Sequence, residues 1–427
     1  MKTHFCNFIF LTISQFAFSQ TYTSYFTGDT SDVQTSTQFG ICLMGGASEN
    51  DDAMKWFLTR AGGGDIVVLR VTGADGYNNY LFTDLGISVN SVETIKIPSR
   101  TAALSPYVKK QLRNAEAVFI AGGNQADYLS FWKNTAVDSA LNFLISSKKV
   151  PIGGLSAGMA IAGDFYFSAS IGSITSSTAL SDPYHPTLTL GNSDFINQPI
   201  LDNTICDTHF DNPDRKGRLL TFMARMQQNL SVKAKAIACD EYTAVCIDST
   251  GIAKVFGSSL EDDFAYFLQT NCLINNLPEI CEAGMPLTWS NGQNAVDVYK
   301  IKGNETGSNQ FNVKNWLTGN GGNWQKWFAQ NGIFSENNVS NSPNCTTTSL
   351  INSQFNEVKI FINPIINTLV ISANGEFEVI ITDILGKIVF KKSGNDLIEI
   401  NTDLFPKGIY LVHLRGNQSI TKKIVIE

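Results

Sequence analysis

The chain has few histidines, little charge and no long apolar run beyond its N-terminus. Only four histidines occur among 427 residues and no Cys-x-x-Cys pair is present, which argues against a zinc site. No later stretch reaches the roughly 18 apolar residues of a membrane-spanning helix. Lysine- or arginine-rich runs are absent, and the formal net charge of −7 argues against nucleic-acid binding. We therefore expect no metal, no cofactor, no nucleic-acid partner and no transmembrane segment.

The N-terminus has the pattern of a secretory signal peptide. Lys2 gives a basic start, the stretch from Phe8 to Phe18 is mostly apolar, and Ala17-Phe18-Ser19 supplies small residues for cleavage. We assign residues 1–19 to this signal. Export to an oxidising compartment permits disulfides. Cys272 and Cys281 are close enough in sequence to close one loop, and the alternative is that most cysteines are buried thiols.

Short apolar runs alternate with helical patterns from Gly40 to about Ala265. The expected strands are Gly40 to Met44, Asp65 to Val71, Ser91 to Ile97, Ala117 to Ala121 and Val150 to Gly153, and the expected helices include Asp52 to Arg60, Ser105 to Asn114 and Ala136 to Ser147. This alternation predicts an α/β fold with a mostly parallel sheet and helices on both faces. Ligands bind such sheets beyond the carboxyl ends of the strands.

The sequence Gly154-Leu155-Ser156-Ala157-Gly158 at one strand end has the form of a nucleophile elbow. Small residues around a serine allow a turn so tight that the serine oxygen is left exposed between a strand and a helix. A Gly-x-Ser-x-Gly motif is weak evidence alone, because a glycine-rich loop can hold an incidental serine. The motif gains weight only if a base and an acid lie nearby.

His209 is the best candidate for the base of this serine. It follows an apolar run that ends at Cys206, whereas His185 lies in a proline-bound loop and His413 lies near the C-terminus. An activated serine also needs a carboxylate to orient the imidazole. Asp240 and Glu241 follow another short apolar strand, and Asp207 is a local competitor. The residues alone do not decide among these three carboxylates.

Backbone N–H groups and nearby polar side chains complete the predicted site. One oxyanion donor would be Ala157, the residue after the nucleophile, and another would come from the turn that holds Gly123. Gln125 could hydrogen-bond a substrate amide or carboxylate. Arg215 and Arg218 open a predicted helix, Arg215 to Gln227, and could clamp a carboxylate, although solvated surface arginines are an equal alternative.

The chain changes character after residue 285. Four tryptophans, Trp289, Trp316, Trp324 and Trp327, lie in residues 285–335, where aromatic packing is favoured over a sugar-binding surface. Residues 335–354 are rich in Ser, Asn and Thr and are assigned as a linker. Residues 355–427 hold about seven short β-rich runs separated by turns, which predicts a small all-β sandwich.

Five ordered motifs resemble the family of serine peptidases that includes cyanophycinase and dipeptidase E. They are Gly45-Gly46-Ala47, Phe119-Ile-Ala-Gly-Gly-Asn-Gln125, Gly153-Gly-Leu-Ser-Ala-Gly158, Asp207-Thr-His-Phe210 with Arg215 and Gly217-Arg218-Leu219-Leu220, and Ile237-Ala-Cys-Asp-Glu-Tyr-Thr-Ala244. The resemblance covers residues 38–334. It implies a flavodoxin-like fold related to class I glutamine amidotransferases, and it is compatible with a homodimer.

By this resemblance Ser156 is the nucleophile, His209 the base and Glu241 the third member of a triad. The resemblance also assigns Gln125, with Asp207, Arg215 and Arg218, to the substrate pocket. Cyanophycinases typically have a glutamine where this chain has Thr208 and an arginine where it has Pro213. The reaction class is therefore carried over, but the aspartyl–arginine polymer that cyanophycinase cleaves is not.

The last 70 or so residues resemble a second family, the sorting domains of type IX secretion in Bacteroidetes. The matching residues are Ile362-Asn-Pro364, Thr382-Asp-Ile-Leu-Gly-Lys387, Lys407-Gly-Ile-Tyr410 and Thr421-Lys-Lys-Ile-Val425. The resemblance implies export through the periplasm to the cell surface or the medium, with the type IX machinery as a partner.

The sequence thus predicts a secreted serine exopeptidase that acts on peptide or isopeptide bonds near aspartyl residues. Two alternatives belong to other classes. One is a surface binding protein that kept the fold but lost activity, and the other is an amidase for small amides.

Overall fold

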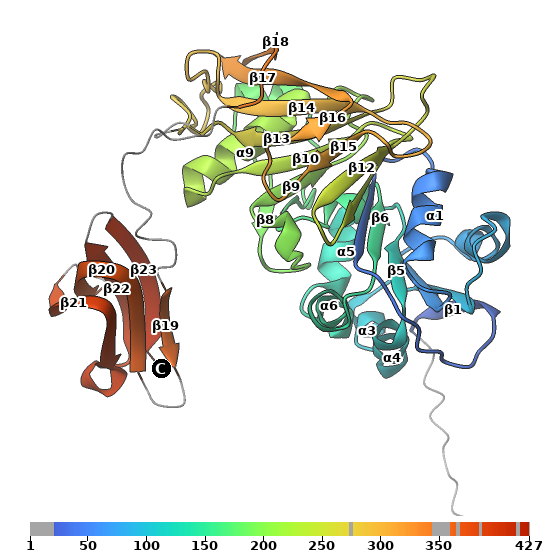
Figure 1. The fold of residues 1–427 in the computed structure, drawn as a ribbon, viewed down its shortest axis with the longest axis horizontal. Helices are drawn as coiled ribbons and strands as arrows, with labels where there is room; N and C mark the ends of the chain where they lie inside the picture. The colour runs from blue at the N-terminus through green and yellow to red at the C-terminus, as the bar shows by residue number, and fades with distance from the viewer. Residues whose placement is uncertain are drawn as a thin grey trace, which may run out of the picture. The chain divides into compact units, whose positions relative to one another are not determined.

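The computed structural model of the chain describes residues 21–272, 276–343, 359–363, 368–383, 387–415 and 419–426 (Figure 1). The chain divides into two compact units, Met1–Cys345 and Thr346–Glu427. The predicted signal peptide, residues 1–19, lies outside the described residues. Among those that are described, no helix is both long and apolar enough to cross a membrane.

The first unit contains a ten-stranded sheet whose centre is parallel. Five adjacent strands, β4, β3, β5, β6 and β2, run parallel, and the flanking strands are antiparallel. The full order is β1 (Thr23–Gly28), β4 (Ser91–Lys96), β3 (Asp65–Arg70), β5 (Ala117–Ile120), β6 (Ile152–Leu155), β2 (Gly40–Met44), β11 (Ala244–Asp248), β12 (Ile252–Phe256), β15 (Gln310–Asn312) and β16 (Gly319–Asn320). Every strand expected up to the elbow is present, within two residues at its ends.

Helices cover this sheet and the second sheet of the same unit (Figure 1). They are α1 (Asp51–Thr59), α2 (Gly76–Asn79), α3 (Arg100–Ala103), α4 (Pro106–Asn114), α5 (Gln125–Trp132), α6 (Ala136–Phe143), α7 (Ala157–Ala160), α8 (Ser176–Ser181) and α9 (Lys216–Leu230). Apolar side chains of α1 pack on β2 and β11, and those of α4 and α6 pack on β3, β5 and β6. The α/β prediction is therefore confirmed.

A second sheet of eight strands corrects the expectation of one mostly parallel sheet. Its order is β18 (Ile333–Val339), β17 (Gly322–Gln330), β14 (Val296–Lys302), β13 (Phe264–Thr270), β10 (Lys235–Cys239), β9 (Thr204–Asp207), β7 (Phe165–Phe167) and β8 (Leu190–Asn192). Only the β10–β9 and β7–β9 pairs are parallel. The two sheets face each other across a buried core that includes Ile41, Leu43, Val245, Ile237 and Phe267. The predicted base and acid therefore follow strands of the second sheet.

The tryptophan-rich segment closes this second sheet. Trp324 and Trp327 lie on β17, and all four tryptophans of the segment are buried. The aromatic-packing interpretation is confirmed, and the alternative of a sugar-binding tryptophan surface is wrong.

The second unit is a five-stranded antiparallel sheet with its own apolar core. Its strands are β19 (Lys359–Asn363), β20 (Thr368–Asp383), β21 (Ile388–Asn401), β22 (Gly408–Arg415) and β23 (Ser419–Ile426), in the order β19-β20-β22-β23 with β21 also paired to β20. Each of β20 and β21 spans two of the seven predicted strands, because the chain stays extended through a register shift between Ser372 and Glu376. The five strands thus form one hydrogen-bonded sheet, in which the two halves of β20 have different partners.

Two further expectations need correction. The linker predicted over residues 335–354 begins too early, because β18 continues to Val339; residues 344–354 lie outside the described part of the chain. Cys272 does not pair with Cys281, because Cys281 is a free, buried thiol while Cys272 is disulfide-bonded.

Candidate active site

The strand β6 and the short helix α7 form a sharp turn at Ser156. Ser156 has φ 51° and ψ −111°, a backbone conformation that an L-residue seldom adopts. A Cβ on Gly154 would overlap the backbone of Gly158, and a Cβ on Gly158 would overlap the carbonyl of Ile120. Both glycines of the motif are therefore required by close packing of the turn.

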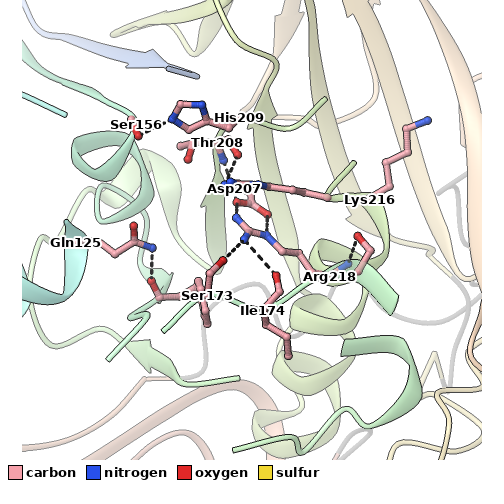
Figure 2. A network of polar contacts seen from close by, with 12 residues as sticks. Gln125, Ser156, Ser173, Ile174, Asp207, Thr208, His209, Lys216 and Arg218 are labelled. Atoms are coloured by element: carbon pink, nitrogen blue, oxygen red, sulfur yellow. Dashed lines mark hydrogen bonds and ion pairs between the residues drawn. The ribbon is translucent and has the colours of Figure 1, made fainter. Parts of the chain in front are cut away.

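His209 lies directly against the Ser156 hydroxyl. The Ser156 Oγ is 2.8 Å from Nε2 of His209 (Figure 2). His209 follows β9, its φ is 46°, and its N–H donates to the carbonyl of Gly45 over 2.9 Å. A Cβ on Gly46 would overlap the imidazole ring, so the missing side chain at Gly46 makes room for the histidine.

Glu241 holds the other nitrogen of this imidazole. Its Oε1 is 2.6 Å from Nδ1 of His209, and Asn212 donates to its Oε2 over 3.4 Å. The hydrogen bond from His209, together with that from Asn212, lowers the pKa of the Glu241 carboxyl. An ionised carboxylate at this position favours the histidine tautomer with its proton on Nδ1, in which Nε2 is a hydrogen-bond acceptor.

The other candidate carboxylate of this strand end points away from the histidine. Asp240 is buried and its Oδ2 accepts the N–H of Phe264 over 3.2 Å, while no partner of its Oδ1 lies among the described residues. Burial raises the pKa of Asp240 to about 7. The two neighbouring carboxylates therefore have different partners.

The other two described histidines are engaged elsewhere. His185 contacts the Thr187 hydroxyl within its own loop, and His413 lies in the C-terminal unit. Among the described histidines, only His209 hydrogen-bonds the Ser156 hydroxyl.

The turn after β5 lies beside the serine. A Cβ on Gly122 would come within 3.7 Å of the Ser156 Cβ. Tyr128 donates its hydroxyl hydrogen to the carbonyls of Ala121 and Gly122, and these bonds hold both carbonyls on one side of the turn. Within the described residues, neither Gly122 nor Gly123 donates its N–H to another backbone group. The turn thus leaves donors available next to Ser156.

Asp207 and Arg218 bind each other. Arg218 Nε donates to Asp207 Oδ2 over 2.9 Å, Nη2 donates to Oδ1, and that Oδ1 also accepts the N–H of Thr208 (Figure 2). Nη1 lies 3.5 Å from the oxygens of Ser173 and Ile174. Both charged side chains are about 4% exposed. The sequence leaves a carboxylate clamp and a surface arginine as equal alternatives for Arg218; in the structure its guanidinium is buried and bound to Asp207.

Gln125 and Arg215 keep unused polar groups. Gln125 begins α5 and donates from Nε2 to the carbonyl of Phe167 over 3.0 Å (Figure 2). Arg215 is half-buried and donates from Nη1 to the carbonyl of Thr208, while its buried Nε has no partner within the described part of the chain. Burial and the nearby Arg218 lower the pKa of Arg215.

Two residues of the histidine loop were missed as site residues from the sequence. Asn212 contacts Glu241, and Asp211 accepts the Glu241 N–H over 2.9 Å. Their only signal is that they follow His209 directly in sequence, since their contacts depend on how two loops meet. No group of three or more metal-ligand side chains is gathered within the described ranges.

Two parts of the chain match models of known protein families. Residues 75–255, which include Ser156, His209 and Glu241, match the family model of peptidase family S51. This unit resembles the S51 peptidases. Residues 359–427 match the model of a secretion system C-terminal sorting domain, which directs type IX export to the cell surface or outside. The family matches support a hydrolase of the peptidase class.

Individual relatives of the S51-like unit are distant. Cyanophycinase of Nostoc sp. is 24% identical over 232 residues, which cover 52% of this chain and 72% of the relative. Cyanophycinase of Synechococcus elongatus is 24% identical over 228 residues, covering 51% and 65%. Among solved structures, a peptidase from an acI-B1 Actinobacterium has a TM-score of 0.41 at 11% identity, covering 65% of this chain and 98% of that one. A putative peptidase E from Listeria monocytogenes has a TM-score of 0.34 at 16% identity, covering 52% and 100%.

Proposed function

We propose that the protein is an exported serine peptidase that uses Ser156, His209 and Glu241 as a catalytic triad. The observation that carries this proposal is the unbroken hydrogen-bond chain from the Ser156 Oγ through both imidazole nitrogens to the Glu241 carboxylate. In such a chain the histidine acts first as a base and then as an acid, and the carboxylate stabilises the imidazolium.

The reaction begins when His209 Nε2 takes the Ser156 proton and the Oγ attacks the substrate carbonyl carbon. The carbonyl oxygen becomes an oxyanion, which accepts hydrogen bonds from the N–H groups of Ala157 and Gly123. The imidazolium then gives its proton to the departing amine, and the C–N bond breaks. A water molecule, deprotonated by His209, hydrolyses the resulting acyl-enzyme and restores the serine.

We propose that the substrates are peptides or isopeptides with an acidic residue at the cleaved bond, and that the enzyme removes terminal residues. We assign Arg215 to the substrate carboxylate, because its side chain is half-buried and, among the described residues, no carboxylate binds it as Asp207 binds Arg218. We assign Gln125, whose Nε2 donates to the Phe167 carbonyl, to the same substrate pocket. The buried Asp207–Arg218 pair positions the Thr208–His209 segment, because Asp207 accepts the N–H of Thr208.

The fold supports this assignment at a coarser level. The flavodoxin-like arrangement that the family resemblance implies agrees with five adjacent parallel strands and an elbow after β6. The C-terminal sheet is assigned to sorting rather than to catalysis.

A peptide library tests the proposal. The exported protein is incubated with α- and β-aspartyl dipeptides, matched asparaginyl dipeptides and small amides, and the products are measured by mass spectrometry beside the Ser156→Ala variant. We expect hydrolysis of the acidic peptides by wild type alone. Hydrolysis of the small amides only would indicate the amidase, and no Ser156-dependent product from any member would overturn the peptidase assignment.

A further inference from the structure

Two cysteine thiols face each other on the neighbouring strands β2 and β11. Cys42 on β2 and Cys246 on β11 are directly opposed in the antiparallel register. Their Sγ atoms are 3.5 Å apart, and both residues are fully buried. They are 204 residues apart in sequence, so only the folded sheet brings them together.

Both thiols point to the same side of the sheet. Each Sγ lies 4.0 Å from the carbonyl oxygen of Ala53 on α1. Opposed residues of an antiparallel pair have Cα atoms about 4.5–5.5 Å apart, inside the range of about 4.4–6.8 Å that disulfides require. Closing the sulfurs to about 2.05 Å therefore needs rotation of the side chains and no large movement of the strands.

We propose that Cys42 and Cys246 form a disulfide bond in the exported protein. Each thiol loses its hydrogen and the two sulfurs bond to each other. The two electrons and two protons pass to the disulfide of a thiol oxidoreductase in the periplasm, which becomes a dithiol. The type IX sorting domain takes the chain through this oxidising compartment, and Cys272 of the same unit is already disulfide-bonded.

The bond forms while the strands pair rather than afterwards. In the folded unit both sulfurs are closed off from solvent, and burial raises the pKa of the Cys246 thiol well above its usual value. A buried, protonated thiol reacts slowly with any oxidant. The same shielding protects the finished bond from reductants outside the cell.

The disulfide would join the two strands that support the histidine and its acid. β2 leads into Gly45, whose carbonyl accepts the His209 N–H, and β11 begins three residues after Glu241. Gly45 in turn donates its N–H to the carbonyl of Thr243, which links the two loops directly. A covalent link between Cys42 and Cys246 would hold this frame in register. The link does not depend on what the site hydrolyses.

Peptide mapping tests the proposal. The full chain, expressed with export to the periplasm, is denatured in iodoacetamide without reductant, digested and examined by mass spectrometry. We expect a linked peptide pair that contains Cys42 and Cys246, with Cys206, Cys239 and Cys281 alkylated. Alkylation of both Cys42 and Cys246 in this sample would overturn the proposal.

Thermal unfolding gives a second, independent measurement. Reduction in denaturant followed by refolding is expected to lower the Tm of wild type by roughly 5 °C more than that of the Cys42→Ala/Cys246→Ala variant. Cys281→Ala serves as the control, because Cys281 is a buried but free thiol. Reduction should lower the Tm of this variant as much as that of wild type. Equal shifts in wild type and the double variant would contradict the link. Should the double variant fail to fold, the mapping result stands alone.

Discussion

At the scale of single residues, the arrangement of the site depends on which way two adjacent carboxylates point. Asp240 and Glu241 differ by one position, yet Glu241 meets the imidazole and Asp240 turns to the Phe264 N–H. The sequence placed both at a strand end but left the choice open. Which of the two carboxylates reaches His209 follows from the local backbone, in which Tyr242 takes φ 61° and donates its N–H to the carbonyl of Gly46.

Replacing the acid of the triad tests its role. Glu241→Gln keeps the size of the side chain but removes the charge that fixes the histidine tautomer and stabilises the imidazolium. We expect kcat to fall by about 10²–10⁴-fold while the fold is retained. Steady-state hydrolysis of an acidic dipeptide and far-UV circular dichroism measure the two effects.

The exposed Glu282 offers a matched control for this substitution. Glu282→Gln makes the same chemical change away from the site and should leave kcat unchanged. A Glu241→Gln variant with the activity of Glu282→Gln would contradict the assignment of Glu241.

Asp240 should make the protein less stable as the pH rises. Its pKa is about 7 in the folded chain, against about 3.9 when unfolded, so the folded state binds the proton more tightly. As the pH rises from about 4 to about 7, the free energy of unfolding therefore falls, and Asp240 accounts for up to about 4 kcal/mol of this loss. The Asp240→Asn variant, which stays neutral, should gain in Tm relative to wild type across this range.

Thermal melts at pH 4.5, 6 and 8 measure this difference. The exposed Asp84 provides the control, and Asp84→Asn should follow wild type at every pH. The same difference in Tm between Asp240→Asn and wild type at all three pH values would show that the Asp240 carboxyl does not titrate as described.

At the scale of elements, the β6–α7 turn depends on two glycines that admit no side chain. Gly158→Ala would place a methyl group against the Ile120 carbonyl, and the turn would have to open. We expect a loss of about 1–3 kcal/mol in the free energy of unfolding, together with loss of hydrolysis because Ser156 moves from His209. Urea titration and a hydrolysis assay measure both.

Gly76 is a suitable control for this change, because a Cβ there would meet nothing within 4 Å. Gly76→Ala should be close to neutral in both measurements. An active, fully stable Gly158→Ala variant would contradict the account of the elbow.

The elements show how far the sequence could predict this fold. The parallel strands and their helices could be predicted from the sequence, because apolar runs, glycine turns and helical periodicity alternate regularly up to Ser156. The second sheet could not be predicted from the sequence, since the pairing of strands such as β10 and β13 is fixed by contacts between distant segments. The predicted Ser156, His209 and Glu241 lie in contact, because β6 of the first sheet and β9 and β10 of the second end at the same place. The closed Asp207–Arg218 pair was not foreseen, because pairing of two buried charges leaves no mark in a single sequence.

At the scale of the whole molecule, each unit has an apolar core made from its own residues. A chain that ends after Cys345 is therefore expected to fold and to hydrolyse peptides like the full chain. It should stay in the periplasm, because it lacks the sorting domain. Immunoblots of periplasm, cell surface and medium measure the location, and hydrolysis by the periplasmic fraction measures the activity.

The full-length Ser156→Ala variant is the control for export, since it should reach the cell surface or the medium normally without hydrolysing anything. Export of the shortened chain at the wild-type level would show that the C-terminal unit is not the sorting signal of this protein.

The central claim is that Ser156 is a nucleophile activated by His209. A fluorophosphonate probe reacts with a serine only where a base activates it, so labelling followed by peptide mapping tests the claim most directly. We expect one label, on the peptide that contains Ser156, and its loss in both Ser156→Ala and His209→Ala. Equal labelling of wild type and Ser156→Ala, or a folded wild-type protein that takes no label, would contradict it.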